Sequence, residues 1–62
     1  MKLYTHKDFT DVQLQIVTKF YIKEKNTYDC KVIWWNKRGW ELCHPYRMQI
    51  TEEKMNELER VI

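Results

Sequence analysis

The chain has no alanine and no serine, and its 62 residues include one glycine, one proline and two cysteines. Without serine there is no serine nucleophile, and one glycine cannot build a glycine-rich phosphate loop. No apolar run is long enough to cross a membrane, and the first residues lack the apolar segment of a signal peptide. We therefore expect a cytoplasmic protein that is not an enzyme, holds no cofactor and does not associate with membranes.

The cysteines and histidines do not have the spacing of a metal site. Zinc sites use ligands paired a few residues apart, and no two cysteines here are separated by two to four residues. Cys43 and His44 are neighbours in a predicted strand, so their side chains point to opposite faces. Cys30 and His44 lack an orienting acid, and they make a weak catalytic pair. We expect Cys30 in the core, Cys43 at the surface and no zinc bound with His6.

Alternation of apolar and polar residues is the strongest positive signal. Between positions 12 and 50, apolar side chains fall mainly on even numbers and polar side chains mainly on odd numbers. A period of two indicates strands with one buried face and one wet face. The even-numbered apolar residues are Val12, Leu14, Ile16, Phe20, Ile22, Tyr28, Cys30, Val32, Trp34, Trp40, Leu42, Tyr46, Met48 and Ile50.

The alternation predicts three antiparallel strands, over residues 11–24, 28–35 and 40–50. The first two strands are joined by a turn at positions 25–27. Because Trp34 and Trp40 are both on even positions, we expect both indoles in the core.

The second predicted turn fixes the pairing of the second and third strands. Asn36 at its first position and Gly39 at its fourth suit a type I turn closed by a left-handed glycine. Pro45 cannot donate a ladder hydrogen bond, which places the third strand at an edge or at a bulge. The predicted register pairs Trp34 with Leu42, Val32 with His44, and Cys30 with Tyr46.

The last segment reads as a helix over residues 51–62. Thr51 is a favourable N-cap, acidic residues follow it, and Met55, Leu58 and Ile62 share one face. Residues 1–10 form either a fourth strand or an arm. The predicted fold is a single α+β domain over residues 1–62, with a three- or four-stranded antiparallel meander and one C-terminal helix on one face.

The predicted helix is too short to cover the apolar face of the first strand. That strand extends about 40 Å at ~3.3 Å per residue. The helix extends about 16 Å at ~1.5 Å per residue. A second copy is the simplest cover, so we expect a homodimer.

The odd-numbered face mixes basic, amide and aromatic side chains. An exposed tryptophan beside basic residues is a typical hot spot for a protein partner. Basic residues around aromatics can also contact nucleic acid, although the net charge of +2 is modest for such a function. The residues predicted to contact a protein partner are Tyr21, Trp35, Lys37, Arg38 and Arg47. The nucleic-acid alternative uses Lys19, Lys23, Lys31 and Arg47.

The composition also bears on origin. Lysine, isoleucine and tyrosine are abundant, and AT-rich codons encode them together with asparagine, phenylalanine and methionine. This favours a low-GC bacterium, or one of its phages or plasmids. We interpret the chain as a small phage- or mobile-element-encoded inhibitor or regulator that binds a host protein, such as a defence protein. The alternatives are a nucleic-acid-binding regulator and a structural subunit of a larger assembly.

Overall fold

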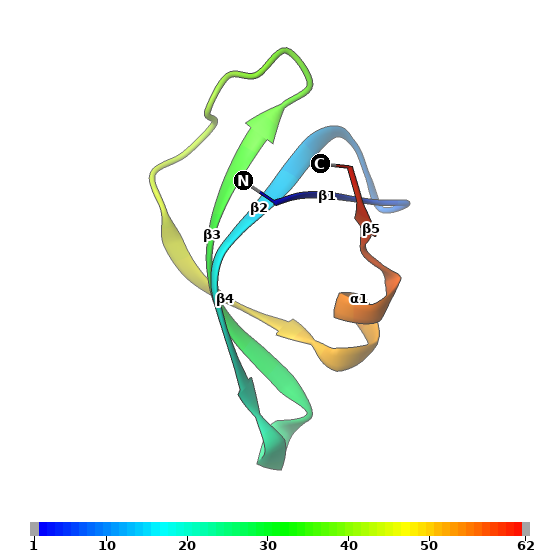
Figure 1. Cartoon of the computed structure of the whole chain (residues 1–62), viewed down its shortest axis with the longest axis vertical. Coiled ribbons are helices and arrows are strands. Elements are labelled where there is room, and N and C mark those ends of the chain that lie inside the picture. Colours follow the sequence, from blue (N-terminus) through cyan, green and yellow to red (C-terminus); the bar gives the residue numbers. More distant parts are fainter. Residues whose placement is uncertain (1, 62) are drawn as a thin grey trace.

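The computed structural model describes residues 2–61, which form a curled antiparallel sheet with one α-helix (Figure 1). The sheet has five strands in the order β4-β3-β2-β1-β5. The α+β class is confirmed, and the sheet has more strands than the predicted meander. In chain order the elements are β1 Leu3–His6, β2 Phe9–Ile22, the 3-10 helix η1 Lys23–Lys25, β3 Thr27–Asn36, β4 Tyr46–Thr51, α1 Glu52–Glu57 and β5 Glu59–Arg60.

The core lies on the concave face of the sheet, which we call the inner face. The chain passes from edge strand β4 through α1 to edge strand β5, and β5 returns to β1 (Figure 1). Met55 and Leu58, in and just after α1, pack against the buried cluster. That cluster consists of Leu14, Cys30, Val32 and Ile50, each at most 4% exposed. All four residues are on even positions, as the alternation predicts.

The N-terminal segment is a strand where the sequence left two alternatives open. β1 pairs with the start of β2, and Tyr4 is the partner of Leu14. Its other edge receives β5, because Tyr4 pairs with Arg60 and the Val61 N–H donates to the Leu3 carbonyl at 2.7 Å. Two strands at the chain ends therefore extend the predicted meander.

A β-bulge at Val17 overturns part of the predicted first strand. The register of β2 against β3 shifts between Ile16 and Thr18, so Val17 is the extra residue. A shift of one residue moves every later side chain to the opposite face. Phe20 therefore pairs with Asp29 on the convex outer face, where the alternation had placed it in the core. The inner face receives the alternate residues, including Tyr21, which pairs with Tyr28.

The turn after β3 forms as predicted. Gly39 has a φ of +88°, and its N–H donates to the Asn36 carbonyl at 3.1 Å. The Asn36 Oδ1 accepts from the N–H groups of Arg38 and Trp40 at 3.0 and 2.9 Å. The side chain of Asn36 thus closes the turn from inside.

The third predicted strand is correct in its second half only. The Leu42 N–H donates to the Trp34 carbonyl at 2.8 Å, which agrees with the predicted pair. Farther on, Val32 pairs with Tyr46 rather than with His44, and β4 begins only at Tyr46. The register has moved by two residues at the segment that contains Pro45, so even positions still meet even positions. The pairings of Val32 with His44 and of Cys30 with Tyr46 were wrong, because Cys30 faces Met48.

The C-terminal helix is about half as long as predicted. The Thr51 hydroxyl accepts from the Lys54 N–H at 3.1 Å, which confirms the N-cap. The helix ends at Glu57, because Leu58 is extended and turns its side chain toward the core. The chain then pairs with β1, Val61 is exposed, and Ile62 lies outside the described residues. Within residues 2–61, no helix has both the length and the apolarity to cross a membrane.

Candidate functional site

The structure does not bring the five predicted partner contacts onto one surface. Lys37 and Arg38 lie exposed at the turn after β3. Trp35 is on the outer face, half-buried, and its Nε1 donates to the Gln15 Oε1 at 2.8 Å. Arg47 is on the same face and forms an ion pair with Asp29.

Tyr21 lies on the inner face, opposite to Trp35 and Arg47, near the turn between β2 and β3. Its hydroxyl donates to the Asn26 Oδ1 at 3.2 Å and to the Glu52 Oε2 at 3.3 Å. Desolvation and then the nearby Glu52 carboxylate raise the pKa of Tyr21. Its ring contacts that of Tyr28 with centroids 4.9 Å apart. These contacts hold the start of α1 to the sheet.

The basic residues of the nucleic-acid alternative are divided as well. Lys31 and Arg47 pair across β3 and β4 on the outer face. The bulge places Lys19 on the inner face, where its Nζ lies 5.5 Å from the centroid of the Tyr28 ring. Lys23 is in η1. These lysines and Arg47 therefore do not form a single basic strip along the sheet.

Three exposed apolar side chains lie after β3 and at the start of β4, at the end of the β2–β3 hairpin opposite to Tyr21. They are Trp40, Leu42 and Tyr46, which are 72%, 51% and 42% exposed. Leu42 pairs with the backbone of Trp34, and the Trp34 Nε1 donates to the Tyr46 hydroxyl at 2.7 Å. With Lys37 and Arg38 beside them, we call these residues the tip patch.

The tip patch corrects the prediction that Trp40 and Leu42 are core residues. The segment between Gly39 and Tyr46 makes an isolated bridge between Trp35 and Glu41 rather than a regular strand, and Trp40 and Leu42 are exposed there. The sequence feature that could have indicated this is Pro45, because a regular strand cannot continue through a proline.

An apolar hollow of about 320 Å³ lies on the inner face between β4 and α1, and Trp34 forms part of its wall. The Tyr46 hydroxyl also contacts the Met48 sulfur at 3.8 Å, so the tip patch and the hollow share neighbouring side chains. The hollow is lined by Phe9, Leu14, Trp34, Met48, Gln49, Ile50, Thr51, Lys54 and Leu58.

The tip patch has a positive rim. Within residues 2–61, no acidic side chain forms an ion pair with Lys37 or Arg38. The acidic residue nearest in sequence is Glu41, which is exposed. A partner that presents an apolar side chain beside acidic groups would complement this surface.

A second cluster of titratable groups joins β1 to α1. The His6 Nε2 lies 2.9 Å from the Glu57 Oε1, and the His6 Nδ1 accepts from the Asp8 N–H at 3.0 Å. The hydrogen bond with His6 lowers the pKa of Glu57, and the hydrogen bond with Lys54 lowers the pKa of Asp8. The His6 side chain is buried and both ring nitrogens are occupied, so the cluster holds the fold together. Sequence reasoning missed it because its members are far apart in the chain.

The cysteines lie apart from both clusters. Cys30 is buried in the core and Cys43 is half-buried in the segment before β4, and both are free thiols. Burial raises the pKa of the Cys30 thiol. Among residues 2–61, no three His, Cys, Asp or Glu side chains are grouped so that they could hold a metal ion.

No protein-family model, curated protein or solved structure matches this chain.

Proposed function

We propose that this chain is a small, non-enzymatic protein-binding module that contacts its partner through the tip patch. The observation that carries the proposal is the exposure of Trp40, which is 72% exposed, together with that of its apolar neighbours Leu42 and Tyr46, which are 51% and 42% exposed. Tryptophan is the residue most enriched among binding hot spots, and exposed apolar clusters mark interaction surfaces.

The backbone around Trp40 is fixed before any partner arrives. Its N–H donates to the Asn36 Oδ1 at 2.9 Å, and its carbonyl accepts from the Asn36 N–H at 2.9 Å. Gly39 supplies the left-handed conformation that the turn requires. A fixed loop loses little conformational entropy on binding, which supports its use as a recognition element.

The surroundings of Trp40 indicate the chemistry of the partner. The hollow beside Trp34 is large enough for an apolar side chain, and Lys37 and Arg38 favour acidic groups at the rim. We therefore propose a protein partner with an apolar side chain flanked by acidic residues. The composition and small size support a setting in which a phage or mobile element encodes the chain as an inhibitor or regulator of a host protein.

The two alternative functions predict different results in binding experiments. Binding of nucleic acid through Lys31 and Arg47 would weaken steeply with salt, because phosphate contacts release counterions. It would also depend on the outer face rather than on Trp40. A structural subunit of a larger assembly would bind other chains of that assembly and no separate target.

The test is capture of proteins from a low-GC bacterial lysate, treated with nuclease, on immobilised wild-type chain and variants. We expect Trp40→Ala and Arg38→Glu to lose a protein that the wild type retains. Trp35→Ala is the matched control, because Trp35 lies on the other face. Equal capture by the wild type and Trp40→Ala would contradict the proposed surface.

A further inference from the structure

The second half of β2 has an open edge. β1 pairs with β2 only over its first half, and the pairing closest to the bulge joins Leu3 to Gln15. Beyond the bulge at Val17, residues 18–22 are paired on one side with β3. In the described part of the chain, no strand lies on their other side. Open edges offer unpaired backbone N–H and C=O groups to another strand.

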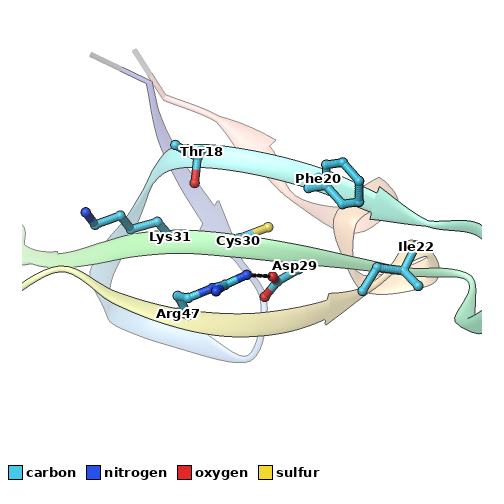
Figure 2. A pocket seen from close by; sticks show the side chains of 7 residues that line it. All are labelled: Thr18, Phe20, Ile22, Asp29, Cys30, Lys31 and Arg47. Carbon is cyan, nitrogen blue, oxygen red and sulfur yellow. Dashed lines mark hydrogen bonds and ion pairs between the residues drawn. The ribbon is translucent and has the colours of Figure 1, made fainter.

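The side chains at this edge are unusual for a solvated surface. Phe20 is 70% exposed on the outer face, where Ile22 follows it. A hollow of about 480 Å³ opens beside them on this face (Figure 2). It is lined by Thr18, Phe20, Ile22, Asp29, Cys30, Lys31 and Arg47. The bulge therefore places Phe20 and Ile22 on the outer face, where Phe20 is exposed and Ile22 is half-buried, although the alternation predicted both in the core.

The other two edges of the sheet carry features that limit pairing. Pro45 directly precedes β4, and α1 begins immediately after it. β5 consists of two residues. Residues 18–22 contain no proline, no bulge and no acidic side chain, and one lysine is their only charged residue. Of the three edges, this one is the least protected.

We propose that a second copy of this chain occupies this edge, with the two β2 strands antiparallel about a two-fold axis at Phe20. The sequence of the open edge is complementary to itself in this register. Phe20 faces Phe20 of the partner subunit, and aromatic cross-strand pairs are stabilising. Lys19 faces Tyr21 of the partner subunit, which is a favourable cation–π pair. Thr18 faces Ile22 of the partner subunit, and no like charges oppose each other.

This register also uses the whole open edge. Residues 18–22 are centred on Phe20, so an axis at Phe20 pairs all of them, and each inner face continues into the inner face of the other copy. Five residues a side make a small interface, and interfaces below about 1,200 Å² are weak. We therefore expect a dimer that dissociates on dilution. The alternation predicted a homodimer through the even-numbered face, whereas this interface lies along the edge of β2 that β1 leaves unpaired.

The dimer is independent of the proposed tip patch. Residues 18–22 lie near the η1 end of the β2–β3 hairpin, and Gly39 lies beyond its other end. A dimer joined at Phe20 would leave both copies of Trp40 accessible. Two linked tip patches would bind a partner with two sites more tightly than one patch does.

The test uses the fact that a two-fold axis brings a residue opposite itself. Light scattering after size exclusion would follow the mass of the wild type, Phe20→Glu and Phe20→Lys over a roughly hundredfold range of concentration. We expect the wild type to approach twice the monomer mass. Each charged variant should stay monomeric alone, because like charges would meet at the axis, and an equimolar mixture should recover the dimer mass.

Trp40→Glu is the matched control, since it also replaces an exposed aromatic side chain by a carboxylate. It should dimerise like the wild type, and its loss of partner capture would separate the two surfaces. Circular dichroism would confirm that the Phe20 variants are folded. A wild type that stays monomeric, or a dimer that Phe20→Glu leaves intact, would overturn the proposal. Binding of an extended peptide at this edge to a monomeric wild type would assign the edge to another protein.

Discussion

The imidazole of His6 joins the first strand to the helix, with its Nε2 2.9 Å from the Oε1 of Glu57 across 51 positions of sequence. The Nδ1 accepts the Asp8 N–H, so the ring proton is on Nε2 and the Glu57 carboxylate accepts it. The same ring stacks on Phe9 with centroids 5.4 Å apart. One buried side chain therefore connects β1, β2 and α1.

Because of this hydrogen bond, the free energy of unfolding should depend on pH in the acid range. The hydrogen bond from His6 lowers the folded-state pKa of Glu57 below its ordinary value of 4.5. A lowered pKa contributes stability that is present above the unfolded-state pKa and is lost as the pH falls through the folded-state pKa. We expect Glu57→Gln to reduce the loss of stability below about pH 4.5, because the amide does not titrate. Urea unfolding followed by tryptophan fluorescence across the acid range would measure this.

Glu24→Gln is the control for this experiment, because the Glu24 carboxylate is exposed and makes no hydrogen bond or ion pair within residues 2–61. It should leave the acid dependence close to that of the wild type. Identical profiles for Glu57→Gln and Glu24→Gln would mean that the pairing of His6 with Glu57 does not stabilise the fold.

The N-cap of α1 is a second contact with a measurable effect. The Thr51 hydroxyl accepts the Lys54 N–H at 3.1 Å, at the junction of β4 and the helix. We expect Thr51→Ala to lower the free energy of unfolding by about 1 kcal/mol, and Thr51→Ser to lower it by much less. Chemical denaturation would compare them. Equal losses would show that the methyl group of Thr51, rather than its hydroxyl, is the stabilising part.

The part of the fold that the sequence predicted depends on short-range signals. The alternation identified Leu14, Cys30, Val32 and Ile50 as inner-face residues, and all four are buried. The turn residues predicted the hairpin tip, and Pro45 predicted an edge strand. Each of these features is determined by a few neighbouring residues, so a single sequence is sufficient to show it.

The bulge could not be predicted in this way. It changes which face the later residues of β2 occupy, and it does so without changing the alternation of the sequence. Phe20 therefore reads as a core residue although it is exposed. β5 was missed for a different reason, because Glu59 and Arg60 are polar and form a strand only by pairing with β1. Both features are consequences of tertiary pairing.

The candidate site was likewise predicted only in part from the sequence. Lys37 and Arg38 were predicted to be exposed beside a tryptophan, and they are exposed. The tryptophan that stands out beside them is Trp40 rather than Trp35. Extending the third strand back to position 40 assigned Trp40 to the core, whereas β4 begins only at Tyr46 and the preceding segment makes an isolated bridge that leaves Trp40 exposed.

The two thiols should differ sharply in reactivity. Cys30 is 1% exposed and burial raises its pKa, whereas Cys43 is in the more accessible segment before β4. Because the thiolate is the reactive form, we expect Ellman's reagent to modify one thiol readily and the other only after denaturant is added. Cys43→Ala should remove the readily modified thiol. Ready modification of Cys30 in that variant would indicate that the core opens under native conditions.

The neighbouring tryptophans Trp34 and Trp40 should have opposite roles. Trp34 is half-buried, contacts Phe9 edge-to-face with centroids 5.1 Å apart, and donates to the Tyr46 hydroxyl. We expect Trp34→Ala to cost about 3 kcal/mol, since it removes a large side chain that packs against the core. Trp40→Ala should change stability by less than about 0.5 kcal/mol, because most of the indole is exposed to solvent.

Chemical denaturation of the two variants would measure the difference, and Trp34→Phe would separate the packing of the ring from its hydrogen bond to Tyr46. An exposed aromatic side chain that contributes little to folding is free to contribute to binding, which is the property that the proposed function assigns to Trp40. A loss of stability in Trp40→Ala as large as that in Trp34→Ala would mean that Trp40 belongs to the fold. The tip patch would then lose its central residue, and Trp40 would not be the contact that holds a partner at that surface.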